Sequence, residues 1–201
     1  MKKSNKLKIL AAGDIHGDSK LAKKLAEKAK KENVDLVILT GDIMGFIDAK
    51  NLVKPFKDAK QKVLLLHGNH EDAADVDFLA QLYNAKNLNA YSLKYKDVGI
   101  FGAGGAVGFN ASEKDIFDAL KKGNKYLKDM NKKIMVTHMH PAGSKSEFSG
   151  FEGSKGIRKA IKEFHPDILI HSHIHEAEGI EGKIGKTRVI NVGRKGKIIE
   201  L

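Results

Sequence analysis

Five short apolar runs constrain the fold of this chain more than any other feature of its sequence. Each run is too short for a helix and rich in β-branched residues, which is typical of a strand buried on both faces. The runs occupy residues 8–13, 35–41, 62–68, 133–138 and 167–173. Because a stretch with helical periodicity separates the first two runs, the sequence predicts β-α-β units and parallel strands.

Amphipathic stretches between the runs predict helices. Within residues 19–33, Leu21 and Leu25 share one helical face and lysines cover the other. Ser112, with Asp115 three positions later, is a capping-box pattern. The predicted helices are residues 19–33, 49–60, 74–83, 113–130 and 155–164, and the further strands are 91–96, 99–102, 188–192 and 197–200. Strands that follow one another directly, mixed with β-α-β units, indicate an α/β fold with more than one sheet.

We expect a single domain over residues 1–201, because the chain can build one core and no Gly/Ser-rich linker divides it. No stretch approaches the roughly 20 apolar residues of a membrane span. The apolar run near the N-terminus contains Lys8 and meets Asp14 where a signal peptide would need its cleavage site. These features predict a cytoplasmic protein without a membrane partner.

Each of the five runs ends in side chains that bind metals or carry protons. The residues concerned are Asp14, His16, Asp42, Asn69, His70, His138, His140, His171, His173 and His175. Of the 9 histidines, only His165 lies away from these ends. Ligands of α/β proteins bind outside the carboxyl ends of the strands, so the sequence predicts a functional site there.

The residue types at these ends suit a pair of metal ions. In an extended chain residues two apart face the same way, so Asp14 and His16, like His173 and His175, are expected to aim at one place. Asp42 can bridge two cations with one oxygen to each. Two Asp, one Asn and four His are more ligands than one ion needs. The chain has no cysteine, and nitrogen and oxygen ligands suit two divalent ions of Mn, Fe, Zn, Co or Ni.

This pattern resembles that of the calcineurin-like metallophosphoesterases, whose motifs are D-x-H, G-D, G-N-H-[ED], a lone His after a strand, and G-H-x-H. The matching residues here are Asp14-Ile15-His16, Gly41-Asp42, Gly68-Asn69-His70-Glu71, His138 and Ser172-His173-Ile174-His175. Each motif alone is common, but all five occur in order over residues 13–175. The resemblance is nearest to the small single-domain microbial phosphodiesterases, and it implies an αββα sandwich of two mixed sheets flanked by helices.

The resemblance also implies the roles of these residues. It implies one ion on Asp14, His16, Asp42 and His175, and a second ion on Asp42, Asn69, His138 and His173. A metal-bridging hydroxide would attack phosphorus in line, and His70 would stabilise or protonate the leaving oxygen. The implied activity is hydrolysis of a small phosphate ester, most readily a phosphodiester, with Asp42 and His70 as catalytic residues.

Two departures from the family pattern bear on this interpretation. Ser172 stands where the family has glycine, and an additional His171 precedes the last pair, which leaves open a register with His171 and His173 as ligands. Residues 43–46 lack the Asp and Arg that follow the second motif in phosphoprotein phosphatases. This segment therefore disfavours a Ser/Thr protein phosphatase.

Several neighbouring polar residues are candidates for supporting roles. His140 is a candidate for substrate contact, with an ordinary polar loop residue as the alternative. His67 and His171 are expected to orient ligands or to pack. Arg158 and Arg194 are candidate contacts for a phosphate oxygen.

The glycine-rich residues 102–110 lack the Gly-Lys-Ser/Thr ending of a phosphate-binding P-loop. We expect them to form a rim above the metals, where Phe109 or Asn110 meets the leaving group. Glu71 and Asp18 are expected to be structural, Asp18 as a helix N-cap.

The net charge of +11 permits a nucleic-acid partner but does not favour one, because the lysines lie mostly on helix surfaces without an aromatic platform. A nuclease is therefore one alternative function. A non-catalytic scaffold on the same fold is another, although such proteins typically lose ligands or the acid histidine, and this chain keeps them all.

Overall fold

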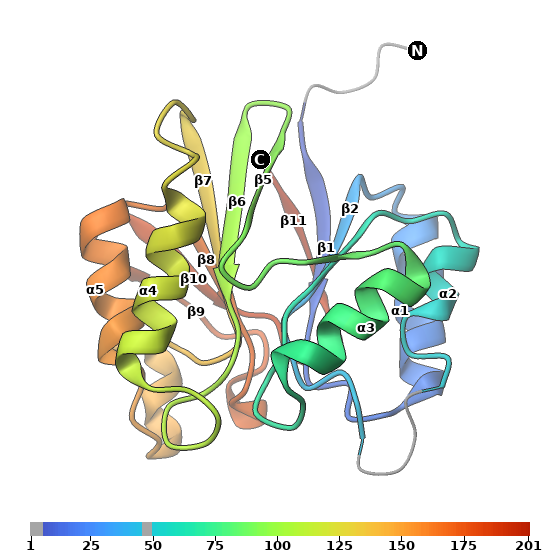
Figure 1. The fold of residues 1–201 in the computed structure, drawn as a ribbon, viewed down its shortest axis with the longest axis horizontal. Helices are drawn as coiled ribbons and strands as arrows, with labels where there is room; N and C mark the ends of the chain where they lie inside the picture. The colour runs from blue at the N-terminus through green and yellow to red at the C-terminus, as the bar shows by residue number, and fades with distance from the viewer. Residues whose placement is uncertain (1–5, 46–49) are drawn as a thin grey trace.

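The chain folds as two β-sheets that pack face to face, with helices covering the outer face of each sheet (Figure 1). The computed structural model describes residues 6–45 and 50–201. One sheet carries the helices α1 (Ser19–Lys31), α2 (Lys54–Asp58) and α3 (Ala73–Tyr83), and the other carries α4 (Glu113–Asn124) and α5 (Lys155–Phe164). The expected αββα sandwich is confirmed.

The first sheet has the strand order β11-β1-β2-β3-β4. Its strands are β1 (Lys8–Ala12), β2 (Leu36–Leu39), β3 (Val63–Leu65), β4 (Lys86–Asn87) and β11 (Lys197–Glu200). The strands β1 to β4 are parallel, and β11 joins β1 in the antiparallel sense. The carboxyl ends of β1, β2 and β3 therefore lie at one edge of the sheet.

The second sheet has the strand order β5-β6-β7-β8-β10-β9. Its strands are β5 (Ser92–Tyr95), β6 (Val98–Ala103), β7 (Lys132–Thr137), β8 (Ile168–His171), β9 (Glu181–Ile184) and β10 (Thr187–Asn191). The inner strands are parallel, and the edge strands β5 and β9 are antiparallel to their neighbours. Short 3₁₀ helices follow β7 and β8, namely η1 (Lys145–Ser149) and η2 (His175–Ala177).

The apolar runs are continuous because each strand is buried on both faces. In β1, Ile9 and Ala11 belong to the core between the sheets, whereas Leu10 and Ala12 pack with the helices on the outside. The inner core joins both sheets, and each outer core joins one sheet to its helices. This packing fixes the two sheets relative to each other and so places their loops.

The five predicted buried strands are confirmed, but two helices are shorter than predicted by more than two residues. The helix expected over residues 49–60 is Lys54–Asp58, and Ala49 lies outside the described residues. Pro55 stands in the first turn, where its missing N–H is tolerated; if the helix began earlier, the proline ring would clash with the carbonyl of the residue four positions before it. The helix expected over residues 113–130 ends at Asn124. Gly123 and Asn124 are weak helix formers, and glycine leaves room for the backbone of residue 91, whose oxygen would lie 2.7 Å from an added Cβ.

Other local features agree with the sequence. Asp18 caps α1 by accepting a hydrogen bond from Leu21 N at 2.9 Å, and Ser112 and Asp115 form the reciprocal capping box of α4. The strands β4 and β9 escaped prediction because they are short or polar edge segments without an apolar run.

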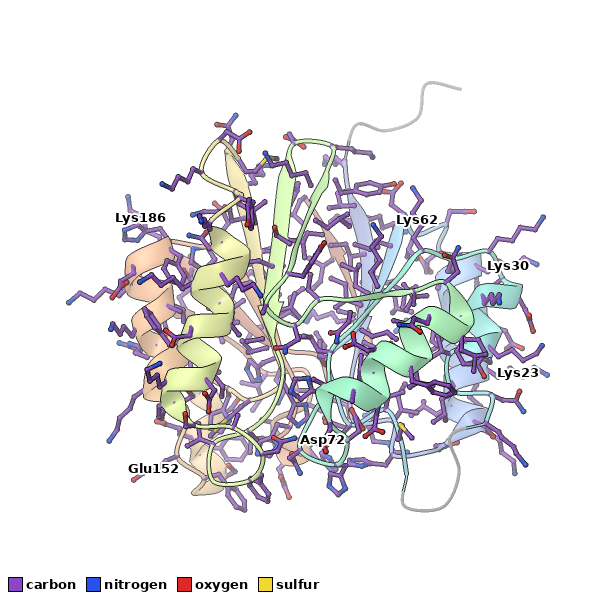
Figure 2. The ribbon with its side chains drawn as sticks, in the orientation of Figure 1. Lys23, Lys30, Lys62, Asp72, Glu152 and Lys186 are labelled. Carbon is purple, nitrogen blue, oxygen red and sulfur yellow. The ribbon has the colours of Figure 1, made fainter. Side chains whose placement is uncertain are left out.

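Lysines project from the outer surfaces, as labelled Lys23 and Lys30 on α1 and Lys186 in the turn between β9 and β10 show (Figure 2). All three side chains are exposed. None of the helices in the described parts of the chain is long and apolar enough to cross a lipid bilayer.

Glu113 connects the two helices of the second layer. Its carboxylate accepts hydrogen bonds from Ser154 Oγ (2.5 Å), Lys155 N (2.9 Å) and Gly156 N (2.6 Å) at the start of α5. Burial by itself would raise the pKa of Glu113, but these bonds outweigh it and lower the pKa below its ordinary value of 4.5.

We predict that Glu113→Ala lowers the free energy of unfolding by about 2 kcal/mol at neutral pH, because three donors lose a charged acceptor. Since folding lowers the pKa, the stabilisation is present above pH 4.5 and disappears as the pH falls through the folded-state pKa. Urea unfolding at several pH values measures the difference. Asp118→Ala, which breaks only the exposed pair with Lys114, is the matched control and should cost less than about 0.5 kcal/mol. Equal losses in the two variants would contradict the assignment.

Candidate active site

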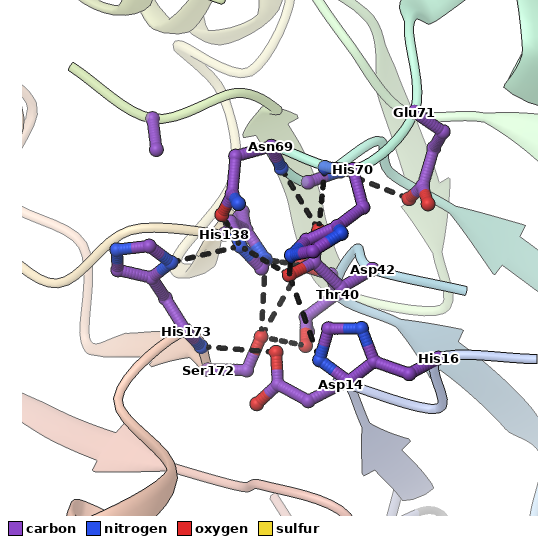
Figure 3. A network of polar contacts seen from close by, with 12 residues as sticks. Asp14, His16, Thr40, Asp42, Asn69, His70, Glu71, His138, Ser172 and His173 are labelled. Atoms are coloured by element: carbon purple, nitrogen blue, oxygen red, sulfur yellow. Dashed lines mark hydrogen bonds and ion pairs between the residues drawn. The ribbon is translucent and has the colours of Figure 1, made fainter. Parts of the chain in front are cut away.

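The predicted site residues converge at the edge where the carboxyl ends of the parallel strands meet (Figure 3). Loops after strands of the first sheet supply Asp14, His16, Asp42, Asn69 and His70, and loops after strands of the second sheet supply His138, His173 and His175. Both sheets therefore contribute to one cluster.

The loops are held by backbone hydrogen bonds that continue beyond the strands. Asp14 N donates to Gly41 O at 3.0 Å, and His16 N donates to Asp42 O at 2.8 Å. The φ angles of Asp14, His16, Asp42 and His173 are 54°, 48°, 50° and 72°, in the left-handed region. Such backbone costs on the order of 1 kcal/mol or more per residue and clusters at functional sites.

The left-handed turns correct the expectation that extended backbone aims the paired side chains. Asp14 and His16 do share one group of candidate ligands, but because of the turns rather than the strand pleat. His173 and His175, by contrast, fall into different groups. The two histidines of this motif therefore point to different groups of candidate ligands: His175 to Asp14 and His16, and His173 to Asp42 and His138.

Two glycines let the loops approach closely. An added Cβ at Gly68 would lie 2.0 Å from Asp42 Oδ1, and one at Gly41 would lie 2.6 Å from His138 Nδ1. Gly41 also has a φ of +109°, which side chains rarely adopt. Gly68 therefore leaves room for the Asp42 carboxylate, and Gly41 leaves room for the His138 ring.

The Asp42 carboxylate lies at the centre of the cluster. Its Oδ1 accepts hydrogen bonds from Asn69 N (2.8 Å) and His70 N (3.0 Å), as Figure 3 shows. Its Oδ2 lies 3.5 Å from His138 Nε2, 3.8 Å from His16 Nε2 and 3.9 Å from His70 Nε2. Oδ1 therefore binds the backbone of the loop after β3, while Oδ2 is the oxygen that lies near the three histidines.

The surroundings of His138 favour a positive charge beside its Nε2. Its Nδ1 lies 3.0 Å from Thr40 O, a pure acceptor, so Nδ1 carries a hydrogen. Its Nε2 then faces Asn69 Oδ1 at 3.0 Å and His173 Nδ1 at 3.2 Å, in addition to the Asp42 carboxylate. When several acceptor atoms converge on one position, their lone pairs repel one another, and a proton or a metal ion at that position removes the repulsion.

The pKa values of His138 and Asp42 also indicate that this position favours a positive charge. Burial would lower the pKa of His138, but the hydrogen bond and charge of Asp42 raise it above 6.5. Burial would raise the pKa of Asp42, but His138 and the His70 backbone N–H hold it well below 3.8. Both shifts have the direction that a position favouring positive charge produces.

The Asp14 carboxylate is a second group that a nearby positive charge would stabilise. Its Oδ1 accepts a hydrogen bond from His173 N at 3.2 Å, whereas its buried Oδ2 has no hydrogen-bond partner in the structure. Burial raises the pKa of Asp14, which means that the folded chain disfavours the bare carboxylate. A cation beside Oδ2 removes this cost.

Within the part of the chain that the structure describes, the candidate ligand atoms form three groups in which all atoms lie within 4.8 Å of one another: Asp14-His16-His175, His16-Asp42-His70 and Asp42-His138-His173. Burial lowers the pKa of His16 to about 4 and that of His173 to about 3, so both rings are neutral near pH 7. His16 Nε2 and His175 Nε2 lie 3.2 Å apart, which suits two ligands of one ion that binds nitrogen at about 2.1 Å. The residues fit a pair of divalent cations.

Two further side chains brace the loops around the cluster. Glu71 accepts hydrogen bonds from Gly68 N (3.0 Å), Ile43 N (3.2 Å) and Met44 N (3.1 Å), and so joins the loops after β2 and β3. Asn110 donates to Gly68 O at 2.8 Å and to Glu71 O at 3.2 Å. Glu71 thus braces the loops around the cluster, and Asn110 ties the glycine-rich rim to the loop after β3; a contact between Asn110 and the leaving group stays a prediction.

Four residues suspected from the sequence lie outside the cluster. His140 is buried, with Nε2 3.1 Å from Phe151 O, and His171 is buried in β8, with Nδ1 3.1 Å from Ser172 O. Arg158 donates to Ala142 O, and Arg194 pairs with Asp18 at 3.2 Å. Within the described residues, none of the four belongs to a ligand group or lines the hollow above the cluster.

That hollow, of about 340 Å³, opens above the cluster. Its lining includes Phe109, Phe151, Ile174 and Glu176, together with the predicted residues His16, Asp42, Asn69, His70, His173 and His175. Phe109 lies on the glycine-rich rim, as expected. Phe151 was missed, and the one available signal was a bulky apolar residue in an otherwise polar, glycine-containing loop.

We predict opposite effects from neutralising the two acids in metal-free protein. Asp14→Asn should raise the free energy of unfolding in EDTA by on the order of 1 kcal/mol, because the folded chain disfavours this charge. Asp42→Asn should lower it, because the folded chain favours that charge. Asn tolerates the left-handed backbone of both positions.

Thermal unfolding in EDTA and after addition of Mn²⁺ or Zn²⁺ measures both effects. Metal should raise the Tm of the unchanged protein, and both variants should lose most of this gain. If Asp14→Asn destabilised the EDTA-treated protein as much as Asp42→Asn does, the Asp14 carboxylate would not be the costly group.

Comparisons with solved structures place this geometry on a known fold. The protein TT1561 of Thermus thermophilus is 18% identical, with a TM-score of 0.76 over 96% of this chain and 97% of that chain. An archaeal protein described as a novel phosphodiesterase is 17% identical, with a TM-score of 0.55 over 97% and 100%. A dimetal phosphatase from Danio rerio is 11% identical, with a TM-score of 0.61 over 92% and 86%. At these identities the likeness shows the fold alone.

The family comparison reaches further. No curated protein sequence matches the chain. The family model of the calcineurin-like phosphoesterases, however, matches residues 7–177, which include every residue of the cluster. The chain therefore belongs to the calcineurin-like phosphoesterase family and is a metal-dependent hydrolase of phosphate esters that uses two divalent cations.

Proposed function

We propose that this chain is a phosphodiesterase in which His70 donates the proton to the leaving oxygen. The composition of the hollow carries the proposal. Apart from the histidines, its described lining contains no cationic side chain, and Glu176 adds a carboxylate. A monoester dianion would find no Lys or Arg in that lining for its second negative charge, whereas a diester carries a single charge and an additional substituent.

The proposed ligands of one ion are Asp14, His16, Asp42 and His175, and those of the other are Asp42, Asn69, His138 and His173. The groups of candidate ligand atoms support this assignment. Asn69 is supported by its Oδ1, which lies 3.0 Å from His138 Nε2. When bound, two divalent cations supply charge that stabilises the phosphoryl oxygens and a water acidic enough to attack phosphorus.

The residues of the chain orient the substrate and move one proton. His70 lies at the mouth of the hollow, with its side chain 32% exposed and its ring 4.8 Å from that of His16. Its backbone N–H is fixed on Asp42 Oδ1, so the position of its ring depends on that carboxylate. We assign His70 as the general acid because it combines exposure to substrate with a held backbone.

We predict metal-dependent hydrolysis of bis-p-nitrophenyl phosphate, with p-nitrophenyl phosphate turned over more slowly. EDTA should abolish the activity, and Mn²⁺, Zn²⁺ or Ni²⁺ should restore it. His70→Ala should lower kcat by about 10²- to 10⁴-fold, because a positioned general acid contributes that much. Release of p-nitrophenolate measures the rate.

His165→Asn provides the control, since His165 is the exposed C-cap of α5, belongs to no ligand group of the described residues and does not line the hollow, and Asn accepts its left-handed backbone. It should keep full activity. Faster hydrolysis of the monoester would refute the diester preference, and full activity of His70→Ala would refute the role of His70.

Two alternatives have their own observations. Tyr91 and Tyr126, 66% and 62% exposed, line a hollow of about 380 Å³ with Lys94 and Lys122, so aromatic rings do occur among the lysines. This hollow favours the nuclease alternative more than the sequence did, and degradation of single-stranded DNA or RNA tests it. A scaffold without catalysis is disfavoured because the proposed ligands and His70 are all retained.

A further inference from the structure

Exposed phenylalanines gather around the proposed phosphodiesterase site. Among the residues that the structure describes, the large apolar side chains with 50% exposure or more are Phe78, Leu82, Tyr91, Phe109, Tyr126, Phe148 and Phe151. Isolated exposed apolar residues are normal on protein surfaces. Phe109 and Phe151, however, are 69% and 62% exposed and line the same hollow above the metal cluster.

The backbone of Phe109 is held firmly at its place. Phe109 N donates to Ala106 O at 3.2 Å, and Ala106 N donates to Asn110 Oδ1 at 3.1 Å. The Asn110 amide group in turn donates to Gly68 O, in the loop that carries His70. The ring centroid of Phe109 lies 6.2 Å from that of His173, edge to face. Phe109 therefore stands next to a proposed ligand on a braced loop.

The backbone of Phe151 is held by a hydrogen bond to a buried histidine. Its carbonyl oxygen lies 3.1 Å from Nε2 of His140, which is fully buried. Gly153 N, two residues on, donates to Glu147 Oε1 at 2.9 Å. His140, suspected of touching the substrate itself, thus fixes the backbone of a residue that lines the hollow.

We propose that Phe109 and Phe151 bind an aromatic ring of the substrate, so that the substrate class is a phosphate ester that carries a nucleobase. The inference rests on the proposed function. The phosphate would lie at the metal cluster and the ring against the two phenylalanines, where base stacking contributes to affinity whichever base is present.

The chemistry of the hollow favours a ring over a lipid chain. Its large exposed apolar surfaces are the two phenyl groups, and the remaining lining is mostly His, Asp, Asn and Glu. A long acyl chain needs a continuous apolar channel, whereas a heteroaromatic ring needs only flat faces with polar groups beside them. The net charge of +11 also attracts nucleotides, which are anions.

The test compares two inhibitors that differ only in the base. AMP and ribose 5-phosphate are titrated against metal-dependent hydrolysis of bis-p-nitrophenyl phosphate, and their binding to the metal-loaded protein is measured by calorimetry. We expect AMP to bind at least about tenfold more tightly than ribose 5-phosphate, as stacking of one base implies. Phe109→Ala and Phe151→Ala should each lower this ratio by about fivefold or more, and Phe109→Trp should retain it.

Phe148→Ala is the matched control, because Phe148 is also 62% exposed and lies in the same segment but does not line the hollow. It should leave the ratio unchanged. Thermal unfolding should show equal stability for all these variants, since the side chains are exposed. Equal affinity for AMP and ribose 5-phosphate, or an unchanged ratio in both Phe109→Ala and Phe151→Ala, would overturn the inference.

The two proposals fail in different ways. Absence of diester hydrolysis would refute the proposed function, and calorimetry would still report whether the base adds affinity. Hydrolysis without a preference for AMP would refute only the aromatic subsite. Single-stranded oligoadenylate, added as a third inhibitor, identifies the source of the ring: preference for AMP supports a small nucleotide, and preference for oligoadenylate supports the end of a strand.

Discussion

The Asp42 carboxylate is the interaction on which the rest of the site depends. Its Oδ1 fixes the loop after β3 through two backbone N–H groups, and its Oδ2 faces histidines from both sheets. Hydrogen bonds to a charged acceptor are roughly twice as strong as neutral ones. The same group therefore builds the loop that carries His70 and serves as a proposed ligand of both ions. Structure and chemistry cannot be altered separately at this position.

The site is costly to the fold, and the layers around it offset that cost. Asp14 is buried with one oxygen unpartnered, and left-handed backbone occurs at several of the site residues. Such features persist only where the surroundings determine the conformation. Here the surroundings are three apolar cores, one between the sheets and one beneath each helical layer. The metal ions would relieve the electrostatic part of the cost.

Much of this arrangement was predictable from the sequence. Continuous apolar runs identify doubly buried strands, and polar residues after them identify a site, because parallel strands bring their ends together. The direction of individual side chains was not predictable. The left-handed turns at Asp14 and His173 and the division of labour between the Asp42 oxygens depend on contacts between distant loops. The place of Phe151 at the hollow was not predictable for the same reason, since contacts with His140 and Glu147, made by Phe151 and Gly153, hold its loop there.

The cluster also spans the seam between the two sheets. Asp14, His16 and Asp42 come from one sheet, whereas His138 and His173 come from the other, and the packed core between the sheets sets their separation. Bound cations would therefore link the two sheets to each other. The thickness of this core in turn sets the distance between the ligands of the two sheets. Adding or removing a methyl group between the sheets is therefore expected to change the metal affinity, although the substitution lies far from the ligands.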